Sequence, residues 1–380
     1  MAGLRRRLVR LALATVVTTF LLVRLVRQED HPYRHAAAAS PPPTTTITTT
    51  NLCRSEGWKP FKPPPGGPRR KVYDLIMFND ELDMLEIHLN TTWDSVDWFV
   101  LIEGVKTFTG LNKPLILRRN LNRSFTRYAS KIIYKELAYP PDFEPISTWD
   151  IEDFQRNAML NQVFPALTED DSPHARARAR APRHGDVIVV SDVDEIPRPE
   201  TLDKLRACRF PRRLTLRSKM YHYGFQFLRT GAGGADGKDG QKEREWPHPQ
   251  ATYYQGPRRT VQPNDLRMGL GFFATLWWDR AEIGDAAWHC SSCFATMQAL
   301  LNKMNSFSHT LLNEDRFRDR RRMADRVRAG LDLWDRDGEN LTRIEGNEDV
   351  PSFVLDNRVR FAYLLNRDGE SAGFIDYYDG

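Results

Sequence analysis

The sequence predicts an α/β fold in which helices flank a mostly parallel central sheet. Apolar runs of strand length alternate with segments of helical periodicity. The first unit is β-α-β, with strand candidates at residues 72–78 and 97–103 on either side of a helical segment at 81–89. Such alternation is typical of parallel sheets that are buried under helices on both faces.

Later segments continue this pattern. Short apolar runs at residues 131–134 and 186–190 predict two further strands, and a helix at 150–164 separates them. Residues 316–328 are basic and helical, and their mixture of charges predicts a solvated helix face instead of an anion-binding site. Two low-complexity stretches, at about 168–184 and 231–245, are expected to be insertions on exposed loops.

The N-terminus has the composition of a membrane-targeting signal. An arginine-rich start, residues 1–7, precedes an apolar segment at 8–26 that is long enough to cross a thin membrane. No small-residue cleavage site follows closely, so we expect a signal anchor, with a cleaved signal peptide as the alternative. The positive-inside rule then predicts that residues 1–7 form a cytoplasmic tail.

Residues 27–70 are expected to form a disordered stalk, because they are rich in proline and threonine and contain few large apolar side chains. A single large domain would follow at residues 71–380, on the lumenal side of the membrane. The glycosylation sequons at Asn90, Asn122 and Asn340 are compatible with this placement.

Composition argues against several classes of protein. The formal charge is +5, but 50 acidic residues offset 55 basic ones, so nucleic acid is not an expected partner. The four cysteines are too few for a disulfide scaffold, and in an oxidising lumen we expect them to be bridged or buried. A zinc site is not favoured, because Cys290 and Cys293 have no second ligand cluster to complete it.

Three carboxylates directly follow the strand predicted at residues 186–190. They are Asp192, Asp194 and Glu195. Ligands of open α/β sheets bind beyond the carboxyl ends of the strands. Side chains two residues apart in an extended chain point to the same side, so Asp192 and Asp194 can hold one divalent cation through oxygen. The alternative for this motif alone is a polar turn that closes the strand.

Other polar side chains follow other predicted strands. Asn79, Asp80 and Glu81 come after the first strand, and Glu103 ends the second. Helix capping is the alternative for Asp80, and a solvated strand end is the alternative for Glu103.

Several separated blocks of the sequence resemble glycosyltransferase family 17, the bisecting β-1,4-mannosyl-glycoprotein 4-β-N-acetylglucosaminyltransferase family. In order they are FNDELDMLEIHL, VDWFVLIEGVKTFTGLNKPL, VIVVSDVDEIPRPETL, WHCSSCF and FAYLLN. The resemblance implies a GT-A-like nucleotide-sugar-binding fold and a single-pass type II protein of the Golgi membrane. It also implies UDP-N-acetylglucosamine (UDP-GlcNAc) as donor and Mn²⁺ or Mg²⁺ as cofactor. The two insertions depart from the family pattern, so the acceptor stays open.

The implied reaction is an inverting transfer of N-acetylglucosamine to a mannose of a glycoprotein N-glycan. Asp192 and Asp194 would hold the ion against the diphosphate. His289 would complete the ligand set, and a packed residue beside Trp288 is the alternative for this histidine. Inversion needs a carboxylate that takes the proton of the acceptor hydroxyl. Glu195 is the first candidate for this base and Asp285 the second.

The resemblance also suggests donor-binding residues. Asn79, Glu81 and Glu103 are candidates for contacts to uridine and ribose. Arg156, on the predicted helix, is a candidate for phosphate, with a surface salt bridge as the alternative.

Three alternatives remain. The first is a glycosyltransferase of the same fold with a different acceptor, and the second is a non-catalytic carbohydrate-binding protein of the secretory pathway. The third is a phosphotransferase in which Asp192 is the nucleophile, although no small or hydroxyl residue follows the motif soon enough for that class. Trp277 and Trp278 are either core residues or a stacking platform for a sugar ring.

Overall fold

The computed structural model describes residues 49–168, 179–231, 244–270, 279–308 and 312–378. The expected tail and anchor, most of the stalk, most of both insertions, and Trp277 and Trp278 lie outside these residues. In the part of the chain that is described, helices are too short or too polar to cross a membrane.

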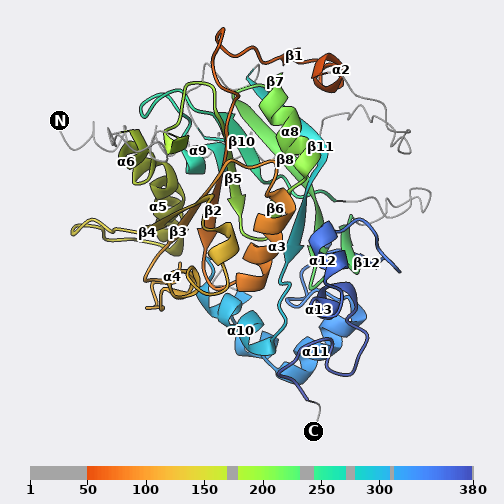
Figure 1. Cartoon of the computed structure of the whole chain (residues 1–380). Coiled ribbons are helices and arrows are strands. Elements are labelled where there is room, and N and C mark those ends of the chain that lie inside the picture. The colour runs from red at the N-terminus through yellow and green to blue at the C-terminus, as the bar shows by residue number, and fades with distance from the viewer. Residues whose placement is uncertain (1–48, 169–178, 232–243, 271–278, 309–311, 379–380) are drawn as a thin grey trace, which may run out of the picture. The chain divides into compact units, whose positions relative to one another are not determined.

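A ten-stranded sheet forms the centre of the described unit (Figure 1). One half of this sheet is parallel, in the order β5-β2-β3-β4, and it contains the four strands that the sequence predicts. Their bounds are Val72–Phe78 for β2, Trp98–Glu103 for β3, Ile132–Glu136 for β4 and Val187–Asp192 for β5. Every residue of β2 is buried, as expected for a strand with helices on both sides.

The other half of the sheet is mainly antiparallel, so the expectation of a mostly parallel sheet is wrong there. β10 joins the halves by pairing antiparallel with both β5 and β8. Among the described strands of this half, the one parallel pair is β8 with β11. The strands are β6 (Glu195–Pro197), β8 (Arg213–His222), β9 (Phe227–Thr230), β10 (Gln250–Tyr253), β11 (Arg280–Ser291) and β12 (Asn340–Arg343). β8 alternates between buried and half-buried residues, so it lacks the continuous apolar run by which the parallel strands are recognised.

Helices cover both faces of the parallel half. Alternate residues of β2 point to opposite sides: Val72 and Ile76 pack in one core with helix α3, and Tyr73 and Leu75 pack in a second core with α5. The described α-helices are α2 (Thr49–Arg54), α3 (Leu82–Thr92), α4 (Ile116–Asn120), α5 (Thr148–Asn161), α6 (Phe164–Thr168), α8 (Pro199–Ala207), α9 (Pro263–Arg267), α10 (Met297–Ser306), α11 (Arg320–Ala329), α12 (Ser352–Asp356) and α13 (Ala362–Leu365).

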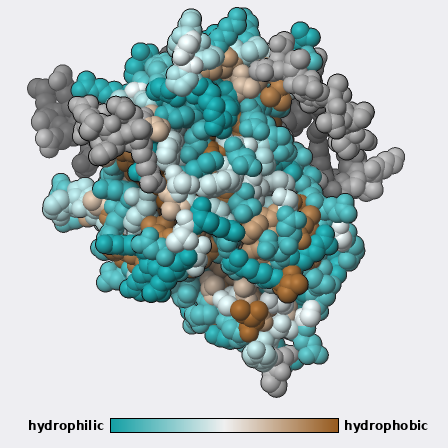
Figure 2. All heavy atoms as spheres, in the orientation of Figure 1, coloured by the Kyte–Doolittle hydropathy of each residue, from teal (hydrophilic) through white to brown (hydrophobic). Residues whose placement is uncertain are grey.

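The basic helix predicted at residues 316–328 corresponds to α11 and the short 3-10 turn before it. Met323 and Val327 are buried, while Arg322 and Arg328 form ion pairs with aspartates at the surface. The expected solvated helix face is therefore confirmed. Figure 2 shows the same character over the visible side of the molecule, where hydrophilic residues predominate and hydrophobic ones form small, separate groups.

The described unit begins before residue 71, the boundary that the sequence predicts. Cys53 of α2 forms a disulfide with Cys208, and β1 (Lys59–Pro60) pairs with β7 (Cys208–Arg209). The side chain of Arg70 is buried and donates hydrogen bonds to the carbonyls of Leu205 and Cys208. Residues 49–70 are thus attached to the domain. The second disulfide joins Cys290 to Cys293, so all four cysteines are bridged, one of the two expected outcomes.

Replacing both Cys53 and Cys208 by serine is expected to lower the free energy of unfolding by about 2–4 kcal/mol. This disulfide joins residues 155 positions apart, so its loss greatly increases the freedom of the unfolded chain. Urea denaturation of the wild type and the double variant measures the difference. An unchanged denaturation midpoint would show that this disulfide contributes nothing to the stability of the domain.

Candidate active site

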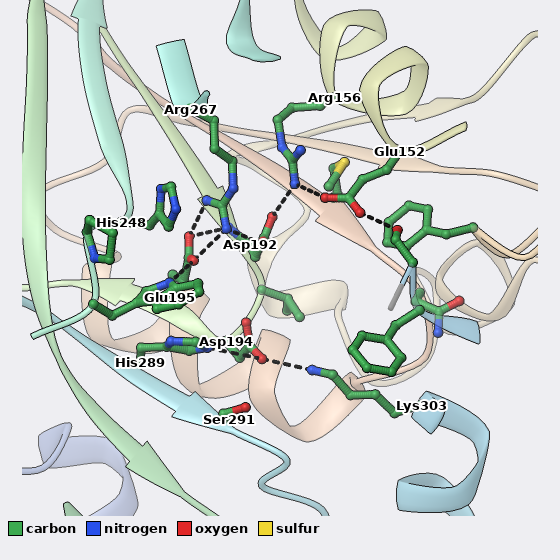
Figure 3. Close-up of a pocket in the computed structure, with 18 of the residues that line it drawn as sticks. Glu152, Arg156, Asp192, Asp194, Glu195, His248, Arg267, His289, Ser291 and Lys303 are labelled. Atoms are coloured by element: carbon green, nitrogen blue, oxygen red, sulfur yellow. Dashed lines mark hydrogen bonds and ion pairs between the residues drawn. The ribbon is translucent and has the colours of Figure 1, made fainter. Parts of the chain in front are cut away.

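A cavity of about 1290 Å³ lies beyond the carboxyl ends of β2 and β5. Residues from both halves of the sheet line it, together with residues of α5, α9 and α10. Asp192, Asp194 and Glu195 are among the lining residues, so the structure places the predicted carboxylates together in this cavity (Figure 3). Its position is the one at which open α/β sheets bind ligands.

Asp192 ends β5 and faces two arginines. Its Oδ2 lies 2.6 Å from Nη2 of Arg267, and its Oδ1 lies 3.3 Å from Nη2 of Arg156. Arg156 also pairs with Glu152 one turn earlier on α5, at 2.7 Å. Both oxygens of Asp192 therefore already accept hydrogen bonds from guanidinium groups. These two ion pairs suit Asp192 to a place in a charged network and do not favour the nucleophilic role that a phosphotransferase would need.

Glu195 begins β6 and is held on every side. Arg267 donates to both of its carboxylate oxygens, at 2.7 and 2.8 Å, and the indole of Trp246 donates to Oε1 at 2.8 Å. The backbone N–H of Asp192 donates to Oε2 at 3.1 Å. Burial raises the pKa of Glu195, but the charge and the hydrogen bonds of Arg267, together with nearby histidines, lower it by more, so the net pKa lies well below the ordinary value.

These contacts suit Glu195 to positioning Arg267 and do not suit it to accepting a proton. A general base needs a lone pair facing its substrate and a pKa near the working pH. Asp285, the second candidate for the base, lies on β11 outside the cavity and forms an ion pair with Arg198. The geometry therefore supports neither carboxylate as the base.

Asp194 lies on the opposite side of the cluster and faces a lysine and a histidine. Its Oδ2 lies 3.0 Å from Nζ of Lys303 on α10 and 3.7 Å from Nε2 of His289 on β11. Burial raises the pKa of Asp194, but the charges of Lys303 and His289 more than offset this, and the net pKa is far below the ordinary value. Asp194 is therefore ionised throughout the physiological range.

Three of the four predicted donor-binding residues line the cavity, and the fourth does not. Asn79, Glu81 and Arg156 line the cavity, whereas Glu103 is fully buried outside it. The carboxylate of Glu103 accepts hydrogen bonds from the backbone N–H groups of Leu117 and Arg118 in the first turn of α4. Glu103 is thus a structural residue that binds the N-terminus of a helix.

The sequence alone does not indicate that Arg267 and Lys303 belong to the site. The acidic motif indicated that positive charge must be close, because buried carboxylates are costly without it. No local pattern shows which cation supplies that charge, since Arg267 and Lys303 lie 75 and 109 residues from their aspartate partners.

The expected metal ligands fit an ion only in part. Asp194 and His289 lie side by side and are both of a type that binds Mn²⁺ or Mg²⁺. Asp192 does not join them, because its oxygens face arginines. Within the described ranges, no group of three or more histidine, cysteine, aspartate or glutamate side chains is arranged to hold a metal ion. A two-residue site would therefore depend on oxygen atoms of the substrate.

Asp80 lies beside the cavity, and its ionisation should make the stability of the protein depend on pH. Burial, and then the charge of Glu81, raises the pKa of Asp80 from 3.8 to about 7. Between these values the folded protein binds more protons at this site than the unfolded chain, so ionisation of Asp80 opposes folding as the pH rises. Asp80→Asn should therefore gain stability relative to the wild type from about pH 4 to about pH 7, and the gain should stay constant above. Urea midpoints across this range measure it, and a difference that does not vary with pH would contradict the raised pKa.

Comparison with known proteins identifies the family. The profile of glycosyltransferase family 17 matches residues 8–233 and 279–370. The chain belongs to glycosyltransferase family 17. The matched segments carry the three carboxylates, His289 and Lys303, whereas Trp246 and Arg267 lie between the two segments. The resemblance that the sequence blocks suggested is thus confirmed.

Similar proteins carry the name of one enzyme. The chain is 27% identical over 320 residues to the human protein named beta-1,4-mannosyl-glycoprotein 4-beta-N-acetylglucosaminyltransferase, and the match covers 78% of the chain and 55% of that relative. The rat protein of the same name is 26% identical over 319 residues, covering 78% of the chain and 54% of the relative. The chain therefore spans about half the length of the curated relatives it matches.

Proposed function

We propose that this protein is an inverting N-acetylglucosaminyltransferase that moves N-acetylglucosamine from UDP-GlcNAc to a mannose of a glycoprotein N-glycan. Family membership and the names of the similar proteins support the reaction class. The cavity beyond β2 and β5, with its charged cluster, carries the proposal, because it offers a nucleotide sugar a large site at the ligand-binding edge of the sheet. We further propose a GT-A-like fold and a type II placement in the Golgi membrane.

The charge of the cluster supports a cation-assisted site. Five carboxylates and three basic groups pair with one another here and leave two net negative charges. They are Glu81, Glu152, Asp192, Asp194 and Glu195 with Arg156, Arg267 and Lys303. A diphosphate brings more negative charge, so further positive charge is needed to bind it. Mn²⁺ or Mg²⁺, held by Asp194 and His289, would supply that charge and stabilise the departing UDP as a Lewis acid.

The protein's own side chains have distinct roles in this proposal. Arg267 joins Asp192 to Glu195 and fixes the turn between β5 and β6. This β5–β6 turn also holds Asp194 in place. The backbone carbonyl of Asp194 accepts a hydrogen bond from the N–H of Cys290 on β11. A rigid framework of this kind keeps Asp194 and His289 in place before substrate arrives.

The proposed function is tested with the purified full chain, a panel of sugar nucleotides and a set of defined mannose-containing glycans. Mass spectrometry should detect addition of one N-acetylglucosamine to a mannose-containing glycan from UDP-GlcNAc, and not from UDP-glucose or UDP-galactose. A chelator added before the donor tests whether transfer depends on a divalent metal ion. Glycan binding without hydrolysis or transfer of any sugar nucleotide would instead support the non-catalytic carbohydrate-binding alternative.

A further inference from the structure

We propose that Lys303 binds the diphosphate of the donor and neutralises the charge that develops on the departing UDP. This inference rests on the proposed function and assigns a further residue to it. Lys303 lines the cavity on α10, and its neighbours Leu300 and Met304 are buried in the core beneath that helix. The backbone that carries the lysine is therefore fixed by packing.

Lys303 differs from the two arginines of the cluster in access to the cavity. The side chain of Lys303 is 23% exposed, whereas those of Arg156 and Arg267 are 3% and 8% exposed. The guanidinium groups are occupied by Glu152, Asp192 and Glu195. Among the cations of this cluster, Lys303 is thus the most accessible to a ligand.

The ammonium group of Lys303 also retains hydrogen-bonding capacity. An ammonium has three N–H donors. Asp194 accepts from one of them at 3.0 Å, and Glu81 is 4.0 Å away, beyond hydrogen-bonding distance. Nζ therefore lies between the segment that follows β2 and the turn that follows β5, with donors available to an anion bound in the cavity.

The role is chemically simple. In the transfer, the acceptor oxygen bonds to C1 of the sugar as the bond between C1 and the phosphate oxygen breaks. UDP leaves with the bonding electrons, and the acceptor hydroxyl gives up its proton to a general base. Lys303 stays protonated and donates hydrogen bonds to the diphosphate.

The experiment compares the binding of UDP with the binding of uridine, which lacks the phosphates. Isothermal titration of the purified full chain is made on the wild type, on Lys303→Met, and on Lys303→Arg. Loss of a charge-assisted hydrogen bond should weaken UDP binding about ten- to a hundredfold in Lys303→Met and leave uridine binding within about twofold. Lys303→Arg should recover part of the affinity for UDP. The matched control is Lys135→Met, which removes an exposed lysine of β4 outside the cavity.

Equal losses for UDP and uridine, or an unchanged affinity for UDP, would overturn the assignment of Lys303. If thermal denaturation shows that Lys303→Met is unfolded, Lys303→Gln replaces it. The loss of affinity for UDP is then compared with the loss of affinity for uridine in that variant. A wild type that binds neither UDP nor uridine would refute the proposed function itself. A wild-type preference for UDP that persists in the folded variant would refute only the role of Lys303.

Discussion

Replacing Arg267 by methionine is expected to lower the free energy of unfolding by about 3–5 kcal/mol. Arg267 is 8% exposed and neutralises both Asp192 and Glu195, and Glu195 is 1% exposed. The variant would leave a buried glutamate without its cation. Urea denaturation should detect the loss, and sugar transfer should fall with it, because the turn that carries Asp194 is no longer fixed.

Two further variants separate this effect from a general loss of surface charge. Arg118 and Glu136 form an ion pair in which both side chains are exposed, so Arg118→Met should cost less than about 1 kcal/mol. Adding Glu195→Gln to Arg267→Met removes the unpaired charge and should recover part of the stability. If Arg267→Met is as stable as Arg118→Met, the buried ion-pair network is not what holds the cluster together.

Replacing Asp194 by asparagine is expected to lower kcat/KM for transfer by at least about a hundredfold. The asparagine side chain would keep the shape of the aspartate but lose the negative charge that faces Lys303 and His289. Steady-state kinetics with UDP-GlcNAc measure the loss, and circular dichroism checks that the variant is folded.

The matched control for Asp194→Asn is Asp285→Asn. Asp285 lies outside the cavity and has a positive φ of 49°, a conformation that asparagine also adopts readily. Transfer should change by less than about twofold in this variant. A large loss in Asp285→Asn together with a small loss in Asp194→Asn would reverse the roles that the structure gives these two aspartates.

The parallel half of the sheet was predictable because its inner strands are buried on both faces. Val72–Phe78 and Val187–Asp192 are nearly continuous apolar runs, and these are visible in a sequence without knowledge of any partner. The antiparallel half was missed because the burial of β8 depends on neighbours that are remote in the chain. The same limit applies to residues 49–70, whose attachment depends on the pairing of Cys53 with Cys208.

The candidate site was predictable to a similar degree. The chemistry of the acidic motif indicated where a ligand would bind, and Asp192, Asp194 and Glu195 do line the cavity. Their individual surroundings could not be deduced, because Arg267 and Lys303 reach them from distant helices. Glu103 shows the converse, since a carboxylate at a strand end was expected to bind substrate and instead caps a helix.

A crystal structure of the protein with UDP-GlcNAc would show where the donor binds. We expect density for the nucleotide sugar in the cavity beyond β2 and β5, with the diphosphate within hydrogen-bonding distance of Lys303 and on the side of the cluster formed by Asp194 and His289. A nucleotide bound away from these residues, in a protein that is active in solution, would contradict this expectation.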